Sequence, residues 1–175
     1  VRPDLDGNAI MELLGVPREQ LDALYGSARA CNLGFVSDLP FVEPARHIAR
    51  LSAQGGVPTF LYVFDYVTEA RRQLSNGASH ASDVPFTFSS LRRVWENITP
   101  ADDALSALLI DCWTRFARSG DPNHGAFAGW KPYTHDSMAL WFTHAGPIVR
   151  ALDTRILDFL ENAHLAAGAK GRHGA

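Results

Sequence analysis

The sequence predicts an α/β fold: a central, mostly parallel sheet flanked by helices, with the sheet incomplete within this chain. Residues 58–66 (PTFLYVFDY) are continuously apolar, aromatic and β-branched, which is typical of a strand buried on both faces. A second, weaker strand is predicted for residues 137–143 (SMALWFT), and helical patterns occupy much of the rest. A central strand needs neighbours that this chain barely supplies. We therefore expect the chain to be part of a larger α/β domain.

The best-defined helix is predicted for residues 100–119. Thr99 is expected to be its N-cap, Asp102 stands where a capping-box acid belongs, and Gly120 is a stop signal. Its leucine and aromatic residues recur at helical spacing, which indicates one apolar face. Four more helices are predicted, for residues 8–14, 17–25, 43–54 and 151–167, whereas residues 31–40 are predicted to be irregular.

Length and composition predict one globular domain and argue against two kinds of partner. The chain has 175 residues, 46% of them hydrophobic, and we expect residues 1–165 to be domain and residues 166–175 to be a flexible tail. With 16 basic and 19 acidic residues, the net charge of −3 argues against a nucleic-acid partner. No stretch approaches the roughly 18 consecutive apolar residues of a membrane span. The two cysteines allow at most one disulfide and no framework.

His80 is the main candidate for chemistry. It lies in a small, polar loop and is followed by an acid, a proline and two phenylalanines (GASHASDVPFTF, residues 77–88). Such a histidine is either a solvated loop residue or a general base at the lip of an apolar pocket. His47, on a predicted helix, is interpreted as a surface residue.

A metal site is an alternative for one group of residues. This group lacks the i, i+3 or i, i+4 pairing of helical ligands, so we expect no metal there. Its members are Asp121, His124, His135, Asp136 and His144.

The order of these segments resembles the C-terminal part of the type B carboxylesterases, the serine esterases related to cholinesterases and bacterial para-nitrobenzyl esterases. The resemblance covers residues 37–160 and implies the C-terminal portion of an α/β-hydrolase fold. The end of the long helix is similar to the family segment W-x-x-F-A-x-T-G-x-P-N. The matching residues are Trp113, Phe116, Ala117, Gly120, Pro122 and Asn123.

The loop around His80 is similar to the family segment that carries the catalytic histidine, H-G-x-E-[LI]-P-[FY]-x-F. The resemblance implies that His80 is the general base and acid, that Asp83 supports it, and that Phe86 and Phe88 are possible walls of a substrate pocket. Two positions depart from the family: Ala81 replaces the usual glycine, and Asp83 replaces the usual glutamate. The methyl group of Ala81 is expected to restrict the backbone beside His80.

The implied activity is hydrolysis of a carboxylic ester by a Ser-Glu/Asp-His triad, with no cofactor and no metal. The chain contains no G-x-S-x-G nucleophile motif and no oxyanion segment of the HGGG type. We therefore expect the serine, the triad acid and the oxyanion hole to lie upstream of Val1. The expected partners are this missing N-terminal portion and an ester with an apolar acyl or alcohol part, and the chain alone is expected to be inactive. The alternative is a non-catalytic interaction or structural module that retains the hydrolase architecture.

Overall fold

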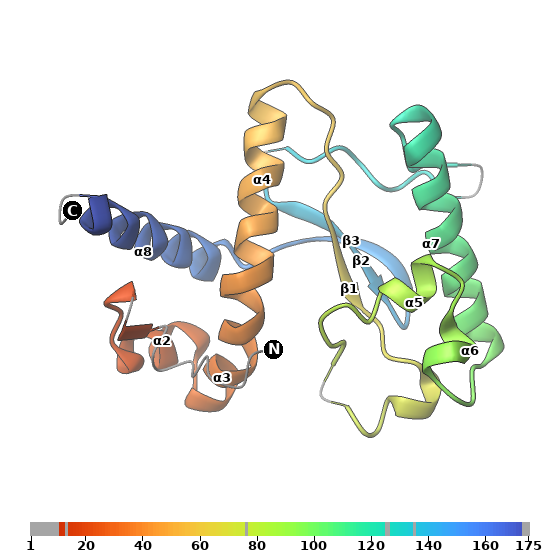
Figure 1. Cartoon of the computed structure of the whole chain (residues 1–175), viewed down its shortest axis with the longest axis horizontal. Coiled ribbons are helices and arrows are strands. Elements are labelled where there is room, and N and C mark those ends of the chain that lie inside the picture. The colour runs from red at the N-terminus through yellow and green to blue at the C-terminus, as the bar shows by residue number, and fades with distance from the viewer. Residues whose placement is uncertain (1–10, 13, 76, 125–126, 135, 173–175) are drawn as a thin grey trace. The chain divides into compact units, whose positions relative to one another are not determined.

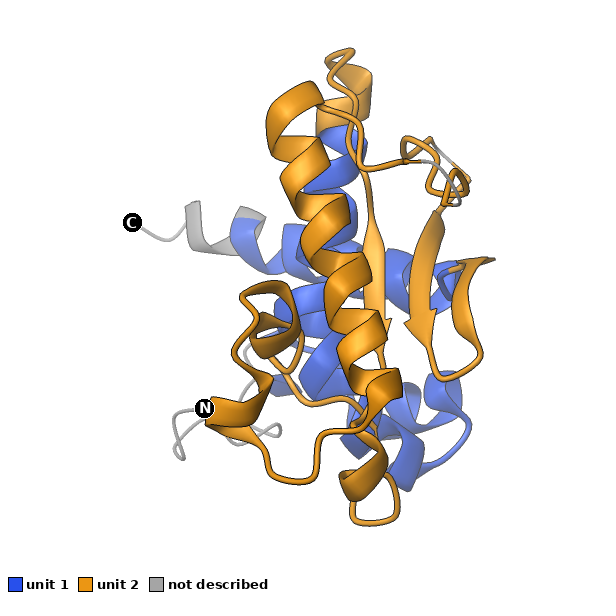
Figure 2. Cartoon of the chain, turned by 90° about the vertical axis from the view of Figure 1, so that its right-hand side faces the viewer, with its two compact units in different colours: residues 1–51, 152–175 blue, residues 52–151 orange. Residues whose placement is uncertain are grey.

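The computed structural model describes residues 11–12, 14–75, 77–124, 127–134 and 136–172. The chain divides into two compact units, one made of residues 1–51 and 152–175 and the other of residues 52–151 (Figure 2). The length and composition of the chain predict a single domain and give no sign of this division. The two units are called unit 1 and unit 2 below.

Unit 2 is built on a three-stranded sheet in the order β1 (Tyr62–Asp65), β2 (Met138–Thr143) and β3 (Gly146–Ala151) (Figure 1). Strands β1 and β2 are parallel, with Tyr62 opposite Leu140, and β2 and β3 form an antiparallel hairpin. The sheet is therefore mixed. Among the described residues β1 pairs on one side only, and Tyr62, Val63 and Phe64 are half-buried rather than fully enclosed.

The helix α7 (Pro100–Ser119) covers this sheet and completes the core of unit 2. Its boundaries and its capping box agree with the sequence prediction: the Thr99 side chain accepts from the Asp102 backbone N–H, and Asp102 accepts from the Thr99 backbone N–H. Gly120 ends it in a left-handed conformation with a φ of 75°. The core is mostly aromatic and leucine-rich, and its buried members are Tyr66, Phe86, Leu91, Leu105, Leu109, Cys112, Trp130, Leu140 and Phe142.

The chain between β1 and α7 contains only short helical segments. These are the 3₁₀ helix η2 (Glu69–Arg71), α5 (Val84–Thr87) and α6 (Leu91–Val94). Segment α5 is held against α7 because the Ser106 hydroxyl donates a 2.6 Å hydrogen bond to the Phe86 carbonyl. This contact fixes the end of the loop that carries His80.

Unit 1 is helical. It contains α2 (Arg18–Tyr25), α3 (Ala28–Ser37), the π-helix η1 (Asp38–Val42), most of α4 (Glu43–Gln54) and α8 (Thr154–Arg172) (Figure 1). Its core is a second, separate apolar cluster, whose buried members are Met11, Leu21, Cys31, Phe35, Ile156 and Leu160. Cys31 here and Cys112 in unit 2 are both free thiols.

The prediction that residues 31–40 are irregular is wrong, because α3 and η1 occupy them. Gly34 and Pro40 disfavour a helix, but Ser27 caps α3 by accepting from the Ala30 N–H at 3.1 Å, and burial of Phe35 stabilises it. Gly34 is needed for packing, since a Cβ there would lie 2.4 Å from the Tyr25 ring.

Other differences concern element ends. Strand β1 is shorter than residues 58–66, and β3 was not predicted because Gly146 and Pro147 are poor strand residues. Helix α8 extends to Arg172, into the segment predicted as a tail. The helix predicted for residues 8–14 lies partly outside the described residues. Within the described part of the chain, every helix is too short or too polar to cross a membrane.

Candidate active site

His80 lies on the surface of unit 2, in a chain of tight turns between η2 and α5. The backbone N–H of Ser82 donates to the Ser79 carbonyl at 3.0 Å, and that of Val84 donates to the Ala81 carbonyl at 3.2 Å. His80 is solvent-exposed, so its imidazole is accessible to a reacting group. The residues from Ser79 to Val84 are called the His80 turn below.

Ala81 adopts a left-handed backbone conformation, with a φ of 63°. Only glycine enters this region without a steric penalty, because a Cβ comes too close to the following carbonyl oxygen. The family's usual glycine suits this conformation, and Ala81 adopts it under strain beside His80.

Asp83 joins the His80 turn to the sheet. Its carboxylate accepts a 2.7 Å hydrogen bond from the hydroxyl of Tyr62, which is the first residue of β1. Burial raises the pKa of Tyr62 and the bond to Asp83 raises it further, so the phenol remains a hydrogen-bond donor at neutral pH. Sequence analysis missed Tyr62, since nothing in a strand of alternating aromatic residues marks one of them as a partner of an acid 21 positions away.

The two phenylalanines after the turn have different environments. Phe86 is 1% exposed and belongs to the core, where its ring lies 5.1 Å from that of Phe64 and 5.6 Å from that of Tyr66. Phe88 is 74% exposed. A role for either ring as a pocket wall stays a prediction, and the exposed ring of Phe88 is the one available to contact a ligand at the surface.

Tyr62 also lines an apolar cavity of about 170 Å³. It is almost entirely aromatic, and its walls are Phe60, Tyr62, Cys112, Trp113, Phe116, Pro122 and Trp130. Burial raises the pKa of the Cys112 thiol to about 11, so this cysteine is neutral and not a nucleophile. The cavity offers apolar contact but no group that could take part in acyl transfer.

Two of the histidines considered as metal ligands, His124 and His144, lie within the described residues, and each lies beside a different carboxylate. His124 lies 2.9 Å from Asp111, and His144 lies 3.4 Å from Glu69 and accepts from the Val67 backbone N–H. His135 lies outside the described residues. The sequence expectation that residues 121–144 hold no metal site stays a prediction.

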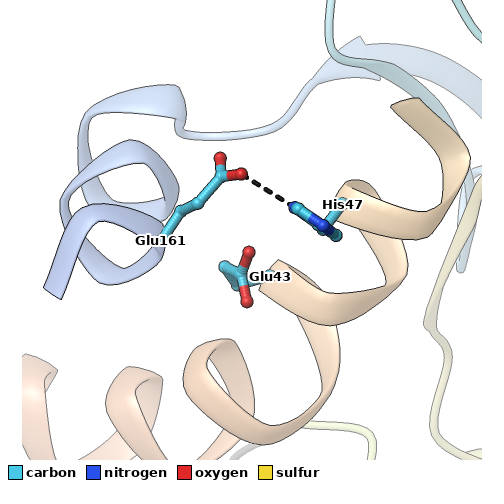
Figure 3. Close-up of side chains that lie close together, drawn as sticks. All are labelled: Glu43, His47 and Glu161. Carbon is cyan, nitrogen blue, oxygen red and sulfur yellow. Dashed lines mark hydrogen bonds and ion pairs between the residues drawn. The ribbon is translucent and has the colours of Figure 1, made fainter. Parts of the chain in front are cut away.

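A different group in unit 1 has ligand-like spacing. Glu43 and His47, one turn apart on α4, approach Glu161 of α8, and their potential ligand atoms lie within 4.8 Å of one another (Figure 3). His47 Nδ1 is 2.8 Å from Glu161 Oε1, so His47 is not the isolated surface residue that its position suggested. Among the described residues this is the one such group of three or more His, Cys, Asp or Glu side chains.

Two arginines argue against a cation in this group. Arg46 donates to Glu161 at 3.1 Å, and Arg50 donates to both of its carboxylate oxygens, one of them at 3.0 Å. Burial tends to raise the pKa of Glu161, but hydrogen bonds from Arg50 and His47 outweigh it and the pKa is lowered. Two guanidinium groups already neutralise the carboxylate and would repel a divalent ion. We assign the group as a buried ion-pair cluster that joins α4 to α8.

Comparison with known proteins places the chain in a family. The model of the carboxylesterase family matches residues 19–155, which include β1, the His80 turn, α7 and β2. The chain belongs to the carboxylesterase family. The described sheet and helices are accordingly part of an α/β-hydrolase fold.

Individual carboxylesterase relatives agree with this assignment. The chain is 28% identical over 130 residues to pyrethroid hydrolase Ces2a of Mus musculus, which covers 71% of this chain and 23% of that protein. It is 25% identical over 171 residues to the medium-chain fatty acyl-CoA hydrolase precursor of Anas platyrhynchos, covering 90% and 30%. The structure of carboxylesterase EST55 of Geobacillus stearothermophilus matches with a TM-score of 0.68 at 25% identity, covering 87% and 33%. The chain thus spans about a quarter to a third of the length of these relatives.

Proposed function

We propose that this chain supplies the general base of a carboxylic ester hydrolase, and that His80 is that base. The observation that carries the proposal is the place of His80: an accessible imidazole in a turn that matches the family's histidine segment and is joined to β1 through Asp83. The family match covers this segment, which supports ester hydrolysis as the reaction class.

The chemistry assigned to His80 is proton transfer. A serine hydroxyl is a weak nucleophile until a neighbouring base takes its proton. In the proposed reaction, His80 accepts this proton as the serine oxygen bonds to the ester carbonyl carbon, and returns it to the alcohol that leaves. Water then attacks the acyl-enzyme with the same proton relay, which releases the carboxylic acid and restores the serine.

The serine, the triad acid and the oxyanion hole are proposed to come from residues upstream of Val1. Three observations support this part. The chain contains no G-x-S-x-G motif, and it spans only 23% of the first of these relatives. The one-sided pairing of β1 among the described residues leaves an edge to which a further parallel strand can bind. We expect this chain alone to be inactive toward esters.

A non-catalytic interaction module is the second candidate. It is favoured by the absence of a nucleophile motif from the sequence, and by Ala81, which places backbone strain where the family usually has glycine. Such a module would fold and remain soluble by itself, whereas a partial hydrolase would expose the β1 edge and tend to associate.

The test is turnover of a short-chain chromogenic ester by the protein that includes the residues upstream of Val1. We expect His80→Asn to lower kcat by at least about a thousandfold. His164→Asn is the matched control, because His164 is also exposed but lies on α8 in unit 1. Equal activity of the two variants would refute the catalytic role of His80, and an inert parent protein would favour the interaction module.

A further inference from the structure

We propose that Tyr62 is a positioning residue for His80: its hydroxyl holds Asp83 against β1 and thereby fixes the orientation of the His80 turn. This inference rests on the proposed catalytic role of His80. It concerns a residue in the strand, 18 positions before the histidine, that does not itself take part in proton transfer.

Two backbone hydrogen bonds close the His80 turn. They join Ser82 to Ser79 and Val84 to Ala81, and these two bonds shape the turn without attaching it to the sheet. Attachment needs a contact to a rigid element outside the turn. The 2.7 Å bond between Tyr62 and Asp83 is such a contact, and it ends on a strand of the sheet.

Asp83 is suited to transmit this constraint because it is bonded at both its side chain and its backbone. Its carbonyl oxygen accepts from the Thr87 backbone N–H at 3.0 Å and from the Thr87 hydroxyl at 3.1 Å, which fixes the start of α5. Its carboxylate accepts from Tyr62. Asp83 therefore connects β1, α5 and the turn, three residues after His80.

Tyr62 is suited to be the fixed end of this connection. Its ring packs edge-to-face against Trp113 at 5.0 Å, Trp130 at 5.9 Å and Phe142 at 6.0 Å. These contacts hold the ring and so determine where the hydroxyl lies. A hydrogen bond from a half-buried, protonated phenol to a carboxylate is charge-assisted and stronger than one between neutral groups.

The connection also accounts for the shorter acid. The family segment usually has glutamate at this position, and Asp83 has one methylene group fewer. The shorter side chain still reaches the Tyr62 hydroxyl at an ordinary hydrogen-bond length. We infer that Asp83 acts on His80 through its pairing with Tyr62.

The test uses the 175-residue chain with Tyr62→Phe, which removes the hydroxyl and keeps the ring. We expect the imidazole NMR signals of His80 to shift or broaden, and the Val84 amide to exchange with solvent about tenfold faster, as loss of one charge-assisted hydrogen bond implies. In a double-mutant cycle, Asp83→Ala should add little once the Tyr62 hydroxyl is gone, because both changes remove the same bond.

Tyr25→Phe is the matched control. It removes another tyrosine–aspartate bond, from Tyr25 to Asp38 at 2.9 Å, but in unit 1. We expect it to leave the His80 signals unchanged. Unchanged His80 signals in Tyr62→Phe, or equal shifts in both variants, would overturn the proposal.

Kinetics separate this proposal from the proposed function. In the protein that includes the upstream residues, Tyr62→Phe should lower kcat about tenfold and change KM little, since it misplaces the base without touching the substrate. If His80→Asn is fully active, the proposed function fails while the NMR result still decides whether Tyr62 positions the turn. If His80→Asn is inactive but Tyr62→Phe has normal kcat and normal His80 signals, only the positioning role fails.

Discussion

Replacing Ala81 by glycine should stabilise unit 2, although most substitutions to glycine destabilise proteins. Ala81 has a φ of 63°, is exposed, and precedes the acid that joins the turn to β1. The substitution removes a single methyl group that makes no core contact. Its effect therefore depends almost entirely on the backbone.

Two opposing terms determine the magnitude. The left-handed conformation costs an L-residue roughly 1–2 kcal/mol, which glycine recovers. Glycine also gives the unfolded chain more freedom, which costs about 0.4–1 kcal/mol. The difference is a net stabilisation of about 0.8 kcal/mol, or a rise of about 0.4 M in the urea midpoint at a typical denaturant dependence of about 2 kcal/mol per molar.

The assay is urea unfolding followed by tryptophan fluorescence, which reports on unit 2 because all four tryptophans lie within residues 52–151. Ala145→Gly is the control: Ala145 is also exposed in a turn, but its φ is not positive. We expect it to lower the midpoint. If Ala81→Gly lowers the midpoint as much as Ala145→Gly does, the left-handed conformation of Ala81 does not cost the folded state measurable free energy, and the prediction is wrong.

Three further predictions concern the ion pairs and the long helix. Glu161→Gln should lower the stability of unit 1 by about 2 kcal/mol in helix unfolding followed by circular dichroism, because it removes the buried carboxylate that accepts from Arg46 and Arg50. Arg46 keeps its 2.6 Å ion pair with Asp158, which limits the loss, and a loss below about 0.5 kcal/mol would contradict this prediction. Because the pKa of Glu161 is lowered in the folded state, its ionised carboxylate stabilises that state fully above the ordinary glutamate pKa of about 4.3. This stabilisation should be lost as the pH falls through the lower pKa of the folded state. In acid unfolding, the Glu161→Gln variant should therefore show a weaker pH dependence of stability than the parent protein. Thr99→Ala should destabilise the protein by about 1 kcal/mol in urea unfolding, since it removes the hydroxyl that caps α7 by accepting from the Asp102 backbone N–H. An unchanged urea midpoint would show that the capping box is dispensable.

Features built from local contacts could be predicted from the sequence. The bounds of α7 and its capping box are correct to the residue, because Thr99, Asp102 and Gly120 act within one turn of the helix ends. The sequence also predicts that the methyl group of Ala81 restricts the backbone beside His80, but the left-handed conformation with its φ of 63° is visible in the structure alone.

Features that depend on residues far apart in the sequence could not be predicted. The bond from Tyr62 to Asp83 joins residues 21 positions apart, and the cluster of His47, Arg50 and Glu161 joins α4 to α8 across more than 100 residues. Each of these side chains is unremarkable in its own segment. Their roles follow from which strand and which helices pack together, and a single sequence contains no direct signal of that pairing.

Chemical rescue tests the central claim most directly. The protein with its upstream residues and His80→Ala would be assayed for ester turnover with and without added imidazole. If His80 is the general base, the variant should be inactive and imidazole should restore part of the turnover by occupying the place of the missing ring. Full activity of the variant without imidazole would contradict the account.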